Sequence, residues 1–198
     1  MGKKKKIVVG ITGGLACGKT TAAGMLAGKG AFVIDADKIA HRLLKEDARV
    51  KKRIINAFGR HILKDKEIDR VKLRREIFAD KRKLERLNRI MHPLIVERIE
   101  EEIARHRGGV LVIDAPLLLE AGTTKLVDIV VLVEAGVEER IERAAKRGIS
   151  ESEAKRIIKH QMPFDEKFKL ADFVINNKGH IKNAKEGVGK LWKRIQEL

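Results

Sequence analysis

The sequence is poor in the residues on which several protein classes depend. Tyrosine is absent, and there are only one tryptophan and six phenylalanines, so repeated aromatic platforms for stacking single-stranded nucleic acid are poorly supplied. A single cysteine, Cys17, excludes an internal disulfide framework and suits a reducing compartment. The longest uncharged apolar stretch, residues 7–17, is too short to span a bilayer. We therefore expect a soluble, cytoplasmic protein with neither membrane nor nucleic-acid partners.

What the chain has in excess is positive charge. Its 198 residues include 44 Lys and Arg against 28 Asp and Glu, which gives a net charge of +16 at pH 7. A basic surface attracts polyanions, and nucleotides are polyanions just as nucleic acids are. The charged fraction of 36% also suggests a thermostable protein, whether from a natural thermophile or from a stability-optimised sequence.

Alternating strand and helix patterns predict an α/β fold. Apolar runs rich in Val and Ile, typical of strands buried on both faces of a parallel sheet, occupy residues 7–11, 31–34, 110–113, 128–133 and 173–175, and Asp128 is the one charged residue among them. Helical patterns follow at residues 19–29, 137–146, 151–161 and 184–198. We expect a single domain with a five-stranded parallel sheet, flanked by helices and connected by right-handed crossovers.

Residues 38–107 interrupt this alternation. Their apolar residues recur at helical spacing, and Asp69 is a plausible cap for one of the helices. The stretch is much longer than a simple crossover between parallel strands requires, and the positive charge is concentrated in it. We predict an inserted helical subdomain over residues 38–107.

The residues after the first predicted strand match the phosphate-binding loop pattern G-x-x-x-x-G-K-[ST] at every fixed position. They are Gly13, Gly14, Leu15, Ala16, Cys17, Gly18, Lys19 and Thr20. Glycines let the backbone N–H groups turn inward toward phosphate oxygens, and the following helix adds its N-terminal dipole. The pattern follows a strand and opens a helix, so it predicts an ATP site that includes these residues and Thr21.

A kinase site of this kind needs ligands for Mg²⁺ and a general base, and carboxylates can serve in both roles. Thr20 and Asp114, which ends the third predicted strand, are candidate Mg²⁺ ligands, although Asp114 also suits a turn. Asp35 and Asp37 follow the second strand, and in an extended segment they would point to the same side. We expect Asp37 to be the general base and Asp35 a substrate contact or structural acid; the alternative is that one of them caps the following helix.

Cationic and polar side chains further along the chain complete the predicted site. Arg143 and Arg147 share one helix face with Arg140, which suggests a lid over the phosphates within residues 138–170 or simply a solvated surface. Asn177 follows the last strand and could meet the adenine or form a turn. The apolar segment that ends in Glu120 could line the acceptor pocket or belong to the core.

The order and spacing of these features resemble the dephospho-CoA kinase family over residues 7–179. Beyond the phosphate-binding loop, the resemblance rests on the motifs Val33–Asp37, Asp69-Arg70, Leu73-Arg74, His92-Pro93, Pro116-Leu117-Leu118 with Glu120, Glu142-Arg143 and Asn177. It implies a P-loop kinase fold and transfer of the γ-phosphoryl group of ATP to the ribose 3′-hydroxyl of dephospho-CoA, with Mg²⁺.

The resemblance also implies roles for individual residues. Asp37 would activate the hydroxyl, Lys19 and Thr20 would hold ATP and Mg²⁺, and Arg143 would belong to the lid. The dephospho-CoA side would be formed by Arg74, His92, Pro116, Leu117, Leu118 and Glu120. On spacing alone, His92 is also consistent with a packed polar residue on a helix.

Two other functions share the phosphate-binding loop. A related small-molecule kinase, acting on a nucleoside monophosphate or a shikimate-like alcohol, would differ only in its acceptor pocket. A nucleic-acid-associated ATPase is motivated by the net charge and by the lysine run at residues 3–6. The scarcity of aromatic residues and the placement of Asp35 and Asp37 argue against this second alternative.

Overall fold

The fold, seen in a computed structural model that describes residues 5–198, divides into two compact units. Unit 1 contains the described residues up to Asp35 together with Glu100–Leu198, and unit 2 contains Ala36–Ile99. The sequence interpretation placed the insertion at 38–107. Lys3 and Lys4 of the N-terminal lysine run lie outside the described residues. Within residues 5–198, no helix is long and apolar enough to cross a membrane.

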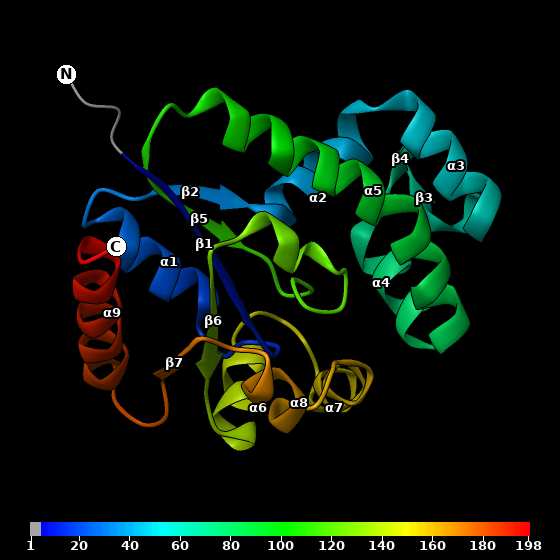
Figure 1. The fold of residues 1–198 in the computed structure, drawn as a ribbon. Coiled ribbons are helices and arrows are strands. Elements are labelled where there is room, and N and C mark those ends of the chain that lie inside the picture. Colours follow the sequence, from blue (N-terminus) through cyan, green and yellow to red (C-terminus); the bar gives the residue numbers. More distant parts are fainter. Residues whose placement is uncertain (1–4) are drawn as a thin grey trace. The chain divides into compact units, whose positions relative to one another are not determined.

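Unit 1 is built on a parallel sheet of five strands in the order β2-β5-β1-β6-β7 (Figure 1). Their bounds are β1 Lys6–Gly13, β2 Phe32–Asp35, β5 Gly109–Asp114, β6 Ile129–Glu134 and β7 Phe173–Asn176. All four strand pairings are parallel, as the sequence predicts. Because parallel strands end at the same edge, the residues that follow β1, β2 and β5 are brought together there.

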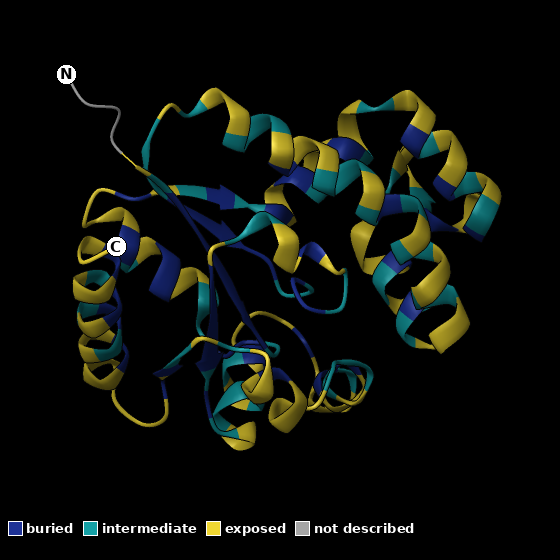
Figure 2. Cartoon of the chain, viewed as in Figure 1, coloured by how far each residue is buried: buried dark blue, intermediate teal, exposed yellow. Residues whose placement is uncertain are grey.

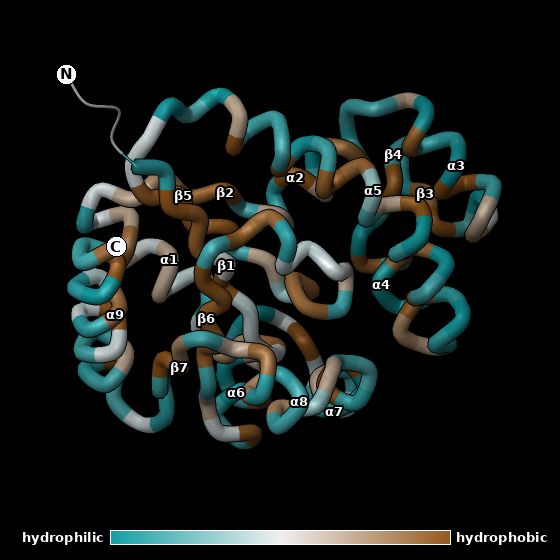
Figure 3. The backbone as a smooth tube through the Cα atoms, viewed as in Figure 1, coloured by the Kyte–Doolittle hydropathy of each residue, from teal (hydrophilic) through white to brown (hydrophobic). Residues whose placement is uncertain are grey.

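Alternation along β1 divides its side chains between the two faces of the sheet. Ile7, Val9 and Ile11 join a buried cluster with α1 (Lys19–Ala27) and α9 (Ile181–Gln196), to which Leu26 and Leu191 contribute. On the other face, Thr12 donates a hydrogen bond to the carbonyl of Pro116. The central strands are therefore both buried and strongly hydrophobic (Figures 2 and 3), which explains why their charged residues occur only at the strand ends.

Three shorter helices of unit 1 occupy the region predicted as a lid. They are α6 Val137–Ala145, α7 Glu151–His160 and α8 Phe164–Lys169. Ser150 caps α7 by accepting a hydrogen bond from the Glu153 amide. The helix α8, which begins after Pro163, was missed because six residues are too few to show a helical period.

Unit 2 contains α2 Ala36–Glu46, α3 Ala48–Phe58, α4 Arg70–Phe78 and most of α5 Lys81–Arg105. Asp69 caps α4 by accepting from the Val71 and Lys72 amides, which confirms its prediction. The sequence interpretation, which gave only helices here, missed a short hairpin. A 3-10 turn, Arg60–Ile62, leads into a hairpin of β3 Leu63–Lys64 and β4 Glu67–Ile68, which is too short for a strand pattern to be visible in the sequence.

Candidate active site

The predicted phosphate-binding loop joins the end of β1 to the start of α1. Gly18 lies in the left-handed region, with φ of 98°, and a Cβ atom there would come within 2.2 Å of Asn177 Nδ2. A side chain at this position would therefore be both strained and obstructed. The Nζ atom of Lys19 donates to the Gly14 carbonyl at 3.1 Å, which folds the lysine back over the loop.

Two oxygen ligands meet beside this loop. The Thr20 hydroxyl donates to Asp114 Oδ2 at 2.7 Å, and Asp114 is only 5% exposed. Asp35 is the register partner of Asp114 across β2 and β5, so it ends its strand at the same edge. Hydroxyl and carboxylate oxygens are the ligands that Mg²⁺ prefers, so the residues present fit this ion. No cluster of three or more His, Cys, Asp or Glu suited to a metal occurs within residues 5–198.

Asn177 contacts the loop from the end of β7. Its Nδ2 atom donates to the Cys17 carbonyl at 2.8 Å, and the side chain is buried. Cys17 itself is buried and forms no disulfide within residues 5–198. In this conformation the amide of Asn177 supports the loop backbone.

Arg140 and Gln161 hold the loop from a second direction. Gln161 Oε1 accepts from the Leu15 amide at 2.9 Å, and Arg140 Nε donates to the Leu15 carbonyl at the same distance. The sequence interpretation did not select either residue for the site. The one available signal for Arg140 was its spacing of three residues from Arg143.

Arg143 lies one turn further along α6 than Arg140. Its Nη2 atom donates to the Asn177 carbonyl at 3.3 Å and lies 3.8 Å from Glu139 Oε1. The Nη1 atom is buried and has no hydrogen-bond partner among residues 5–198. Arg147 is exposed and lies beyond the end of α6, so the predicted helix face shared with Arg140 and Arg143 does not include it. Of the two predicted lid arginines, only Arg143 therefore contacts a residue that supports the loop.

Glu139 fixes the two backbone segments beside Arg143. Its Oε1 accepts from the Gly179 amide at 2.6 Å and its Oε2 from the Gly136 amide at 3.0 Å. These two hydrogen bonds lower the pKa of Glu139, since they stabilise the ionised carboxylate. The sequence interpretation gave Glu139 no role, because its function depends on backbone groups from two loops.

The segment after β5 is held by a buried ion pair. The Nζ atom of Lys167 lies 2.7 Å from Glu120 Oε1, and the lysine side chain is only 1% exposed. Lys167 also donates to the Pro116 carbonyl at 3.4 Å. Leu118 is buried and Leu117 half-buried. The segment is thus rigidly positioned, and Lys167 is its main polar support.

The remaining predicted residues belong to unit 2. Asp37 lies exposed in the first turn of α2, while Arg74 on α4 and His92 on α5 are half-buried. The argument that Asp35 and Asp37 share one side of an extended segment was wrong, because α2 begins at Ala36. Asp35 ends a strand and Asp37 starts a helix, so the two carboxylates have different backbone settings.

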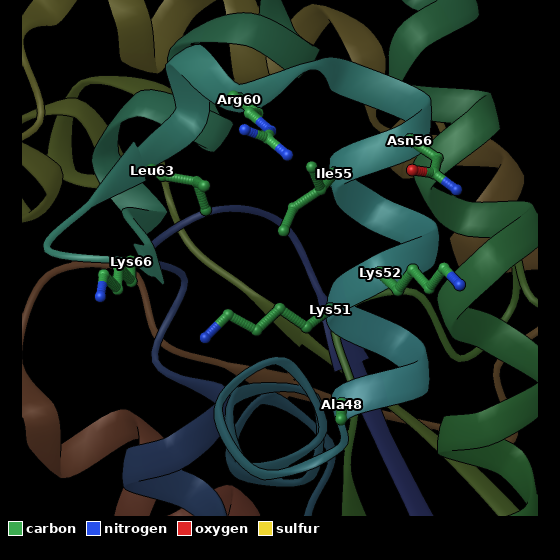
Figure 4. A pocket seen from close by; sticks show the side chains of 8 residues that line it. All are labelled: Ala48, Lys51, Lys52, Ile55, Asn56, Arg60, Leu63 and Lys66. Atoms are coloured by element: carbon green, nitrogen blue, oxygen red, sulfur yellow. The ribbon is translucent and has the colours of Figure 1, made fainter.

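Unit 2 also contains an open, basic pocket of about 530 Å³ (Figure 4). Ile55 of α3 and Leu63 face its interior, and Lys51 extends from the same helix. The other cations around it are Lys52, Arg60 and Lys66. None of these residues belongs to the predicted site, and Lys51 is paired with Glu67 at 2.6 Å.

The sequence model of the family described as dephospho-CoA kinase matches residues 7–183. The chain belongs to the dephospho-CoA kinase family. A dephospho-CoA kinase of Syntrophus aciditrophicus is 38% identical over 94% of this chain and 82% of its own length. ATP-dependent phosphorylation of dephospho-CoA, the family reaction, is the last step of coenzyme A biosynthesis.

Solved structures agree with the dephospho-CoA kinase assignment. A crystal structure of a Thermus thermophilus protein matches with a TM-score of 0.80 and 32% identity, covering 98% of this chain and 99% of the other. The dephospho-CoA kinase from Campylobacter jejuni matches with a TM-score of 0.67 and 28% identity, covering 96% and 97%. The predicted P-loop kinase fold is confirmed.

Proposed function

We propose that the carboxyl edge of the unit 1 sheet binds ATP with Mg²⁺ and presents its γ-phosphoryl group to the ribose 3′-hydroxyl of dephospho-CoA. The observation that carries this proposal is the 2.7 Å hydrogen bond from Thr20 to Asp114. It unites the start of α1 with the end of β5, beside a loop whose glycines expose backbone N–H groups. Thr20 and Asp114 would hold the Mg²⁺ ion, which neutralises phosphate charge when it is bound.

Lys19 is the loop residue that acts on the transferred group. Its ammonium group donates to the Gly14 carbonyl and so lies over the phosphate-binding backbone. It has no carboxylate partner among residues 5–198. An incoming triphosphate offers a stronger, charged acceptor than a carbonyl. Lys19 therefore orients the β- and γ-phosphates for in-line transfer.

Asp37 is the proposed general base, and it removes the proton of the attacking 3′-hydroxyl. Asp37 lies in the first turn of α2 and is exposed. Asp35 remains the second candidate, because it ends β2 in register with Asp114. A base is effective only within hydrogen-bond reach of the proton that it takes, so substitution of each aspartate separates the two assignments.

The other proposed contacts fall into two groups. Arg143 and Arg147 belong to a lid at residues 138–170, and Asn177 supports the nucleotide site by holding the Cys17 carbonyl. Dephospho-CoA is bound by Arg74 and His92 of unit 2 and by the segment from Pro116 to Glu120 of unit 1. Arginine and histidine supply donors for the acceptor's diphosphate, and Leu117 and Leu118 supply apolar contact.

A phosphoryl-transfer assay with ATP and Mg²⁺ tests this proposal. The acceptors are dephospho-CoA, adenosine monophosphate and none, and mass spectrometry reads the products. We expect a gain of one phosphate on dephospho-CoA alone, and fragmentation should place it on the ribose 3′-oxygen. Transfer to the monophosphate would indicate a nucleotide kinase, and ATP hydrolysis without an acceptor product would indicate an ATPase.

A further inference from the structure

The peptide group of Leu15, in the middle of the phosphate-binding loop, is occupied on both sides by residues from the lid region. Gln161 accepts from its amide, and Arg140 donates to its carbonyl. Arg140 Nη2 also donates to Gln161 Oε1 at 3.3 Å, so the two side chains and the peptide form one closed network. The Leu15 N–H is consequently not available to a phosphate oxygen in this conformation.

Arg140, like the half-buried Lys19, has no carboxylate partner among residues 5–198, whereas two other cations of unit 1 do. Lys167 is paired with Glu120, and Arg143 lies near Glu139. Arg140 makes no ion pair with a carboxylate among residues 5–198, and its two hydrogen-bond acceptors, the Leu15 carbonyl and the Gln161 amide oxygen, are neutral. Burial without a counter-ion lowers the pKa of the Arg140 guanidinium.

The guanidinium is pressed against the loop backbone. A Cβ atom at Gly14 would come within 2.2 Å of Arg140 Nη2 and 2.5 Å of its Cζ. Gly14 therefore creates the space in which the cation lies. A buried charge is stable only when it is paired, and the loop beside it is built to receive a polyanion.

We propose that Arg140 is a second cation of the triphosphate site, fixed to the loop by Gln161, and that the bound nucleotide is its counter-ion. The proposal rests on the proposed function of this loop as the ATP site. The positive charge of Arg140 compensates for the N–H that Leu15 gives to Gln161. Arg140 thereby strengthens nucleotide affinity in proportion to phosphate charge, which a purely structural support of the loop would not do.

The test compares the binding of ATP, ADP and AMP by isothermal titration calorimetry, at two salt concentrations. Arg140→Gln removes the charge but leaves a donor for the Leu15 carbonyl. Gln161→Glu keeps an acceptor for both the Leu15 amide and Arg140, and adds a carboxylate that cancels the charge. Lys146→Gln is the matched control, because it removes one exposed charge at the end of the same helix.

We expect both Arg140→Gln and Gln161→Glu to weaken ATP binding about tenfold, ADP binding less and AMP binding little, with the loss reduced in high salt. Lys146→Gln should change the ATP affinity less than about twofold. Melting temperatures should show that Gln161→Glu is as stable as the unmodified protein, because its hydrogen bonds are retained.

Either of two results would overturn the proposal. An equal loss for all three nucleotides in Arg140→Gln, with normal ATP binding in Gln161→Glu, would show that Arg140 only supports the loop. Unchanged ATP affinity in both variants would exclude any contribution of its charge. Because binding is measured without an acceptor, failure of phosphoryl transfer in the unmodified protein would contradict the proposed function but leave this comparison intact.

Discussion

The phosphate-binding loop of unit 1 and the predicted acceptor residues of unit 2 differ in how the surrounding structure holds them. In unit 1 the loop is fixed by side chains from distant parts of the chain, among them Asp114, Arg140, Gln161 and Asn177. In unit 2 the predicted base, Asp37, is exposed on a helix. Under the proposed function, phosphate binding depends on a loop that tertiary hydrogen bonds hold within unit 1, whereas the proposed base lies on an exposed helix turn of unit 2.

Substitution of Lys19 should have the largest effect, because it acts on the phosphate-binding loop of unit 1. We expect Lys19→Ala to lower kcat/KM for dephospho-CoA phosphorylation by about 10³-fold, because the γ-phosphoryl group loses its orienting cation. Lys29→Ala, which removes an exposed charge just beyond α1, is the matched control. Similar losses in the two variants would mean that net charge, not the position of Lys19, matters.

Substitution of Asp37 tests the acceptor side separately. Asp37→Asn should lower kcat by about 10²- to 10⁴-fold, the usual contribution of a general base. The dissociation constant for ATP should stay within about twofold, since the lost group acts on the hydroxyl. Asp35→Asn, measured in parallel, decides between the two aspartates: normal turnover in Asp37→Asn with lost turnover in Asp35→Asn would transfer the role to Asp35.

The two regions should also differ in the stability provided by their ion pairs. Lys167→Met leaves Glu120 without its partner in a site where the lysine is 1% exposed, so we expect a loss of about 2–4 kcal/mol in the free energy of unfolding. In unit 2, Lys51 pairs with Glu67, which is 59% exposed, and Lys51→Met should cost less than about 1 kcal/mol. Urea denaturation measures both, and equal losses would contradict this contrast.

The smallest expected effect is a pH dependence that both regions share. Hydrogen bonds from backbone amides lower the pKa of Glu139 in unit 1 and of Asp69 in unit 2. A lowered folded-state pKa gives stability that is present above the unfolded-state pKa and is lost as pH falls through the folded-state value. Glu139→Gln and Asp69→Asn should each flatten the acid side of the stability profile below about pH 4.5. An unchanged slope in urea midpoints between pH 5 and pH 2 would argue against this linkage.

Local patterns predicted most of this molecule, and long-range packing accounts for what they missed. The strands, the phosphate-binding loop and the Asp69 cap each depend on neighbouring residues, so the sequence identifies them directly. Lys167 and Gln161 act through partners many residues away, as Glu139 does through the Gly179 amide, and nothing beside them in the chain reveals those partners. The error over Asp35 and Asp37 is instructive as well, because α2 begins directly after Asp35, so the backbone at Asp37 is helical and not extended.

The bond from Asn177 to the Cys17 carbonyl has a consequence for synthesis of the protein. It joins residues separated by 160 positions, and Gly18 fits closely against the same amide. During translation the loop is made before Arg140, Gln161 and Asn177, so the hydrogen bonds that these residues give it form only after they have followed it out of the ribosome.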